Sequence, residues 1–137
     1  MMTTAEGPET GIVPASSEGR IWRFADDAFR PTATPGMRRR VITGDGMSLA
    51  FWRIKSGAGP TPYGGHPDNE QFGMVIAGEL DFRLGSRERV RLGPGDVYWA
   101  PTNLPHGDSL FAGDPARDNE VWILDIFQPV REEYRNG

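Results

Sequence analysis

Residues 66–80 read HPDNEQFGMVIAGEL, and residues 92–107 read LGPGDVYWAPTNLPHG. Each stretch joins one of the chain's two histidines to a short apolar run bounded by glycine or proline. His66 precedes its run and His106 follows its run, so both histidines stand in loops at the ends of predicted strands. Short apolar runs bounded by turn residues are typical of β-strands, so the two stretches predict a β-rich fold.

The same pattern extends over the rest of the chain. Its 137 residues include 18 glycines and 12 prolines, which recur at short intervals and separate many short strands rather than a few helices. Only residues 26–29 and 131–134 are predicted as short helices. We predict an all-β domain, either a sandwich or a closed antiparallel barrel. The predicted strands cover residues 21–24, 39–43, 47–54, 71–76, 79–84, 90–92, 97–100 and 119–127.

The ends of the chain and its composition limit the class of protein. Residues 1–18 are rich in Thr, Ser, Glu, Gly and Pro and are predicted to form a flexible arm, with residues 19–137 as one domain. The arm lacks the basic start and apolar run of a secretory signal, and no stretch is apolar for long enough to span a membrane, so we expect a cytoplasmic protein. The absence of cysteine excludes disulfides and thiolate metal ligands.

The charge pattern argues against a nucleic-acid-binding protein. The formal net charge is −4, and residues 38–40 form the one basic run. A single arginine triplet in an acidic chain is a poor electrostatic footprint for nucleic acid. We predict that the triplet is an exposed strand edge or loop, where charges block unwanted strand pairing.

Two loop histidines at strand ends can converge across the mouth of an antiparallel barrel. Imidazole nitrogens with a carboxylate or amide oxygen suit Zn, Fe, Ni or Mn and leave coordination positions open for water or substrate. Glu70 and Gln71 are the nearby oxygen donors, and only one of them can point into the barrel because neighbours in a strand face opposite sides. The alternative is that both histidines are surface loop residues.

The two stretches resemble the two sequence motifs of the cupin family. In that family the first motif has a His-x-His pair, then Glu or Gln, and a strand that runs to a Gly-Glu-Leu turn; the second has Pro-Gly-Asp, then Pro, then His. The resemblance implies a jelly-roll barrel with His66, His106 and either Gln71 or Glu70 as metal ligands. Gly64 stands where the first histidine of the pair is found, so the implied site has three protein ligands, and a metal-free state is an alternative.

Residues 124–134, LDIFQPVREEY, are similar to the end of a group of small cupins of the KdgF type, which convert unsaturated uronates to open-chain keto forms in pectin degradation. In that group a Gln is a metal ligand, which favours Gln71, and an Asp, a Phe and an Arg of the tail face the pocket. The similarity implies catalytic roles for Asp125 and Arg131, and substrate binding by Phe127 and Arg131. Strand alternation independently places Asp125 and Phe127 on one face.

These parts suit a metal-assisted isomerase, tautomerase or lyase that acts on a small anionic, oxygenated substrate such as a sugar acid or keto acid. A carboxylate facing a pocket can transfer protons, an arginine can pair a substrate carboxylate, and Tyr98 can donate a hydrogen bond to the substrate. The alternatives are a metal-dependent oxygenase acting on a small aromatic or diketone, and a metal-free, non-catalytic binding cupin. We also expect a homodimer that pairs through the sheet left uncovered by other elements.

Overall fold

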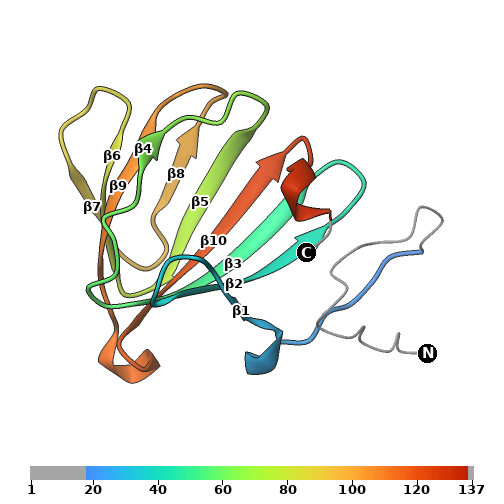
Figure 1. Cartoon of the computed structure of the whole chain (residues 1–137), viewed down its shortest axis with the longest axis horizontal. Coiled ribbons are helices and arrows are strands. Elements are labelled where there is room, and N and C mark those ends of the chain that lie inside the picture. Colours follow the sequence, from blue (N-terminus) through green and yellow to red (C-terminus); the bar gives the residue numbers. More distant parts are fainter. Residues whose placement is uncertain (1–17, 136–137) are drawn as a thin grey trace.

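Two antiparallel sheets form the body of the protein (Figure 1). The computed structural model describes residues 18–135, so the arm predicted over residues 1–18 lies outside the described residues except for its last one. The larger sheet has six strands in the order β1-β2-β3-β10-β5-β8, and the smaller sheet has four in the order β4-β9-β6-β7. This architecture confirms the predicted all-β, cupin-type jelly roll.

The elements are short and follow the turn residues of the sequence. The strands are β1 (Arg30–Pro31), β2 (Met37–Thr43), β3 (Ser48–Lys55), β4 (Tyr63–Gly64), β5 (Glu70–Ala77), β6 (Glu79–Leu84), β7 (Val90–Leu92), β8 (Val97–Ala100), β9 (His106–Ala112) and β10 (Glu120–Gln128). The 3₁₀ helices are η1 (Asp26–Ala28), η2 (Pro115–Arg117) and η3 (Glu132–Tyr134). None of the helices described within residues 18–135 has the length and apolar character needed to cross a membrane.

Seven of the eight predicted strands are present, and the exception lies in the N-terminal segment. Residues 21–24 belong to no strand. Instead, the Phe24 ring stacks on Trp122 with ring centroids 5.8 Å apart and meets the edge of Phe51 at 6.2 Å. Aromatic packing against the outer face of the larger sheet therefore takes the place of the predicted strand hydrogen bonds.

Strand β9 was not predicted, because its sequence interrupts the alternation of polar and apolar residues. Gly107 and Asp108 both have positive φ, 125° and 49°. The pairing of β9 with β6 shifts its register near Asp81 and Arg83. A bulge of this kind adds a residue to one strand and disrupts the period-two pattern on which strand prediction depends.

The arginine triplet is not an exposed edge, so that prediction is wrong. Strand β2 is paired on both sides, with β1 and with β3. Arg38 donates to the buried carboxylate of Glu120 at 3.3 Å, and the buried Arg40 donates to the backbone carbonyl of Arg23 at 2.6 Å. Arg39, on the opposite face of β2, lies over the rings of Trp52 and Tyr134. Each arginine is thus held by a partner that the sequence does not identify.

Strand β10 lies at the centre of the larger sheet, between β3 and β5. Its alternate residues Val121, Ile123, Asp125 and Phe127 are buried on one face, as predicted from strand alternation. A carboxylate is therefore placed in a row of apolar side chains in the interior, where charge is costly unless other groups compensate it.

Candidate functional site

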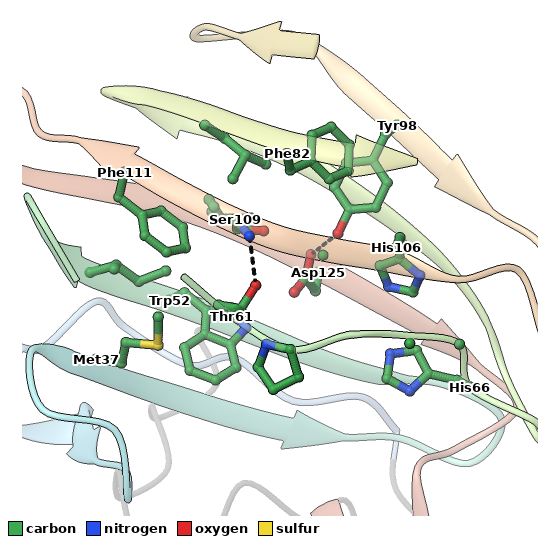
Figure 2. A pocket seen from close by; sticks show the side chains of 17 residues that line it. Met37, Trp52, Thr61, His66, Phe82, Tyr98, His106, Ser109, Phe111 and Asp125 are labelled. Carbon is green, nitrogen blue, oxygen red and sulfur yellow. Dashed lines mark hydrogen bonds between the residues drawn. The ribbon is translucent and has the colours of Figure 1, made fainter. Parts of the chain in front are cut away.

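A cavity of about 410 Å³ lies between the two sheets, and four of the predicted site residues line it. Its walls include both histidines, Tyr98 and Asp125. Figure 2 shows His66 and His106 side by side at one end of the cavity, with Asp125 and the Tyr98 hydroxyl deeper inside. The volume is within the range typical of pockets for small ligands.

The two histidines converge although 40 residues separate them in sequence. His106 begins β9, and His66 lies in the loop between β4 and β5. Their ring centroids are 5.1 Å apart. The register of β4 with β9 pairs Gly64 with His106, and the His66 carbonyl accepts a hydrogen bond from the Asn103 amide at 2.9 Å. Backbone pairing across the loops therefore fixes the two imidazoles at one mouth.

Gln71, and not Glu70, faces the histidines. The Gln71 side-chain Oε1 lies 3.0 Å from Nε2 of His106, and its Nε2 donates to the Tyr98 hydroxyl at 2.7 Å. Glu70 points the opposite way and accepts a hydrogen bond from the indole of Trp99 at 2.9 Å. The alternation of side chains along β5 thus leaves Gln71 as the oxygen donor of the site.

His106 is oriented by its backbone neighbour. Its Nδ1 lies 3.0 Å from the carbonyl oxygen of Leu104, which accepts the Nδ1 proton. In the neutral imidazole this leaves Nε2 as a lone pair directed at the Gln71 oxygen. Two acceptors that face each other at 3.0 Å repel unless a cation or a proton lies between them or the Gln71 amide turns over to donate to His106.

His66 is held by groups that favour its neutral form. Nη1 of Arg131 lies 3.0 Å from Nδ1 of His66, and the ring of Phe127 meets the imidazole edge-on at 5.6 Å. Burial, followed by the charges of Arg131 and His106, lowers the pKa of His66 to about 4. His66 is therefore neutral near pH 7, as a metal ligand or an acceptor of a hydrogen bond from Arg131 must be.

Asp125 is a buried carboxylate with a raised pKa. Burial raises the pKa of Asp125 to about 6, although hydrogen bonds from Gln71, Tyr98 and Trp52 act in the opposite direction. The Tyr98 hydroxyl donates to Asp125 at 3.3 Å, and burial raises the pKa of Tyr98 well above its usual value, so the phenol keeps its proton. An acid that titrates near neutral pH inside a cavity is suited to proton transfer.

The donor set fits a metal ion with three protein ligands. No group of three His, Cys, Asp or Glu side chains within residues 18–135 is placed to hold a metal, so a metal bound by His66 and His106 would need the amide oxygen of Gln71 as its third protein ligand. The separation of the His106 and Gln71 acceptors, 3.0 Å, matches two adjacent ligands that are each about 2.1 Å from one ion. Arg131 would have to move away from the nitrogen of His66 that binds the ion.

Two predicted substrate-binding residues lie behind the histidines and not on the cavity wall. Phe127 is 2% exposed and packs between His66 and Tyr134. Arg131 contacts His66, lies over the Phe127 ring and pairs with Glu133. In this arrangement both residues support the position of His66, and Arg131 reaches the cavity only through that contact.

Sequence reasoning missed Met37, which lines the cavity, and Arg39, which lies near it. Both face inward from β2, because residues two apart in a strand share a face. The Arg39 guanidinium lies 5.3 Å from the Trp52 ring, which lines the cavity, and 4.9 Å from the Tyr134 ring. The signal that could have found them was the period-two pattern of β2, which the unbroken run of arginines hid.

Comparison with known proteins relates this fold to that of the cupins. A model of the cupin domain matches residues 50–109, and no curated protein matches the chain. KdgF from Halomonas sp. is 26% identical, with 80% of this chain and 96% of that chain aligned and a TM-score of 0.66. An RmlC-like cupin from Shewanella frigidimarina is 18% identical over 81% and 93% of the two chains, with a TM-score of 0.62.

Oxalate decarboxylase from Bacillus subtilis shares the fold at 17% identity and a TM-score of 0.60, over 73% of this chain and 27% of the larger enzyme. The matched domain includes His66, Gln71 and His106, so the segment that carries the cupin motifs is the segment that builds the mouth of the cavity. The jelly roll, the cupin-domain match over residues 50–109 and the similarity to KdgF together show that this chain has the cupin fold and resembles the KdgF type.

Proposed function

We propose that this cavity catalyses proton transfer at a carbon next to a carbonyl group, as an isomerase, a tautomerase or a lyase does. The observation that carries the proposal is Asp125, a carboxylate that lines the cavity, is 8% exposed and has its pKa raised to about 6. A base of this pKa is largely ionised near pH 7 and still binds a proton well once it has removed one.

Asp125 is the residue that would move the proton. Its carboxylate takes the proton from the substrate carbon, the electron pair of the broken C–H bond forms a C=C bond, and the carbonyl oxygen becomes an enolate oxygen. Return of the proton to the enolate oxygen gives the enol tautomer, and its return to the same carbon regenerates the substrate with its hydrogen exchanged. Tyr98, whose hydroxyl faces Asp125, then has a free proton to donate to the enolate oxygen, because protonated Asp125 no longer attracts it.

A divalent metal held by His66, Gln71 and His106 would supply Lewis-acid polarisation of the substrate oxygen. The chain's own residues set the position of that oxygen. His106 is fixed by Leu104, and Gln71 is fixed by Tyr98, so both present their polar atoms to the same point in the cavity. Such fixed groups do not have to reorient as charge develops on the substrate.

Two guanidinium groups near the histidine end support an anionic substrate. The guanidinium groups of Arg39 and Arg131 both lie over the Tyr134 ring, 4.9 and 5.1 Å from its centroid. Arg131 already holds a carboxylate, that of Glu133. Arg131 does not line the cavity, so we propose that a substrate carboxylate at the histidine end draws its guanidinium away from Glu133 and toward the cavity, since planar guanidinium groups bind carboxylates in a bidentate manner.

Hydrogen exchange into deuterated water tests the proposed reaction. The protein is incubated with keto acids and with unsaturated uronates, and proton NMR follows the loss of the signal of the hydrogen next to the carbonyl. We expect exchange at a rate well above that of the buffer and without consumption of oxygen. Oxygen uptake coupled to product formation would favour the oxygenase, and binding without exchange or product would favour a non-catalytic cupin.

We also propose that the protein is a homodimer that pairs through β5 and β8. Four large apolar side chains on the outer face of these strands are 39–53% exposed: Phe72, Ile76, Val97 and Trp99. The strand register places Phe72 opposite Trp99, so the side chains form one patch at the edge of the larger sheet. Exposed apolar patches of this kind mark association surfaces, and a second copy is the partner always present.

The substitution Val97→Glu tests this pairing. A carboxylate buried at the centre of the patch would be without a partner, so we expect the dimer to dissociate about tenfold or more readily. Light scattering over a range of concentrations measures the change. Leu110→Glu is the matched control, because Leu110 is 45% exposed on β9 of the other sheet. A monomeric wild-type protein, or equal dissociation of the two variants, would contradict the proposal.

A further inference from the structure

The cavity is polar at one end and apolar at the other. Figure 2 shows His66 and His106 at one end and Met37 and Phe111 at the opposite end, with Asp125 between them. All five side chains line the same cavity. A molecule that occupies it therefore meets two different chemical environments along its length.

The apolar end is built from strand partners in the two sheets. Met37 of β2 is the register partner of Ile54 in β3, and Leu80 of β6 is the register partner of Phe111 in β9. All four line the cavity and are at most 8% exposed. None of these side chains can accept or donate a conventional hydrogen bond, so this end can recognise only apolar groups.

Two hydroxyl side chains, those of Thr61 and Ser109, also line the cavity. Thr61 lines the cavity, and its hydroxyl oxygen accepts a hydrogen bond from the Ser109 amide at 2.9 Å. A sugar acid carries a hydroxyl on nearly every carbon. A hydroxyl placed against Met37, Ile54 and Phe111 would lose its water and gain no partner, which would weaken binding by about tenfold for each such group.

We infer that the substrate is a carbonyl acid with an unsubstituted apolar body, a short alkyl chain or an aromatic ring, and that it is not a polyhydroxylated sugar acid. This inference rests on the proposed proton-transfer function for the identity of the head group. The keto acid head lies at His66, His106 and Asp125, and the body extends toward Met37 and Phe111. The carbon that loses its proton is then the one that joins the body to the carbonyl, beside Asp125.

A homologous ligand series tests the inference by binding alone. Isothermal titration calorimetry is carried out with pyruvate, α-ketobutyrate, α-ketovalerate, α-ketocaproate and phenylpyruvate, and with galacturonate as the polyhydroxylated acid. Affinity should rise about fourfold with each added methylene, which is the value of transferring one methylene from water to an apolar site. Phenylpyruvate should bind at least as tightly as α-ketocaproate, and galacturonate should bind more weakly than pyruvate.

A substitution at the apolar end locates the effect. Met37→Gln keeps the length of the side chain and places an amide at this end, so we expect phenylpyruvate to bind about tenfold more weakly while pyruvate is unaffected. Met47→Gln is the matched control, because Met47 is 55% exposed in the turn between β2 and β3. The ligand series in the wild-type protein gives an answer even if Met37→Gln fails to fold.

Affinities that stay flat or fall along the series, or galacturonate that binds as tightly as phenylpyruvate, would overturn the inference. So would a failure of every acid in the series to bind. The proposed function is judged separately: hydrogen exchange of pyruvate together with a flat series would leave the function standing and remove the inference. A rising series without any exchange would support the apolar body and contradict the proton-transfer function.

Discussion

Replacing Asp125 by Asn should lower turnover by about a hundredfold or more and, at the same time, make the folded protein more stable above about pH 6. The amide keeps the size and shape of the side chain but cannot accept a proton from carbon. It also removes a charge from a site where burial raises the pKa of the carboxyl to about 6. A residue retained for packing alone would not combine these two effects.

The sign of the stability change follows from proton binding. The pKa of Asp125 is about 6 in the folded protein and 3.8 in a model compound, so the folded state binds the proton more tightly. The stabilisation from this proton is complete below about pH 4 and is lost as the pH rises through about 6, which amounts to about 3 kcal/mol. Asp125→Asn does not undergo this loss. The difference between its free energy of unfolding and that of the wild type should therefore grow as the pH rises from about 4 to about 7.

Chemical denaturation of both proteins across this pH range, with a chelator present, measures the difference in free energy of unfolding. Asp45→Asn is the matched control, because Asp45 is exposed in the turn between β2 and β3 and should change neither stability nor turnover. If Asp125→Asn destabilises the protein equally at all pH values and leaves turnover intact, Asp125 is a packing residue and the proposed site is wrong.

Replacing Gly64 by His should raise metal affinity by about a hundredfold or more, because it adds a fourth protein donor to the proposed set of three. Gly64 lines the cavity and lies opposite His106 in the register of β4 and β9. A Cβ atom built at Gly64 has no heavy atom within 4 Å, so a side chain at this position has room. The new imidazole can then approach the point at which His106 and Gln71 converge.

Competition with a chromophoric chelator for Zn²⁺ and Co²⁺ measures the gain, and the Co²⁺ spectrum reports the change in ligands. Gly46→His is the matched control, since a Cβ at Gly46 is equally unhindered but lies in the turn between β2 and β3. Equal affinities for wild type, Gly64→His and Gly46→His would mean that the histidines are not arranged around a metal position.

The fold could be predicted from the sequence because most strands have glycine or proline at their ends and an alternating pattern between them. Strands β6, β7 and β8 show this, since their predicted and observed bounds are the same. Strand β9 could not be predicted, because the positive φ of Gly107 and Asp108 belongs to a bulge that only the pairing with β6 creates. The strand prediction for the N-terminal segment failed for a different reason. Its apolar residue Phe24 packs on Trp122 and does not belong to a strand.

The site was predictable as far as the two motifs extend. His66, Gln71 and His106 lie close together, and the alternation of Glu70 and Gln71 along β5 selects the amide. The apolar end of the cavity was not predictable, because Met37 and Phe111 come from different sheets and their meeting depends on how the sheets pack.

The roles of Phe127 and Arg131 were also beyond the sequence alone. Strand alternation predicts the face of β10 on which Phe127 lies. It does not predict whether the Phe127 side chain lines the cavity or packs against the His66 imidazole. For Arg131 the deciding contact is with an imidazole 65 residues away in the chain. This contact depends on the direction that the chain takes between β10 and η3, and no local sequence pattern specifies that direction.

The pH dependence of hydrogen exchange on a bound keto acid tests the central claim most directly. If Asp125 is the base, the rate at limiting substrate should rise with pH and level off above an apparent pKa of about 6, and Asp125→Asn should remove both the rate and its pH dependence. Exchange in the wild-type protein that is independent of pH between about 5 and 8, or that persists unchanged in Asp125→Asn, would contradict the account.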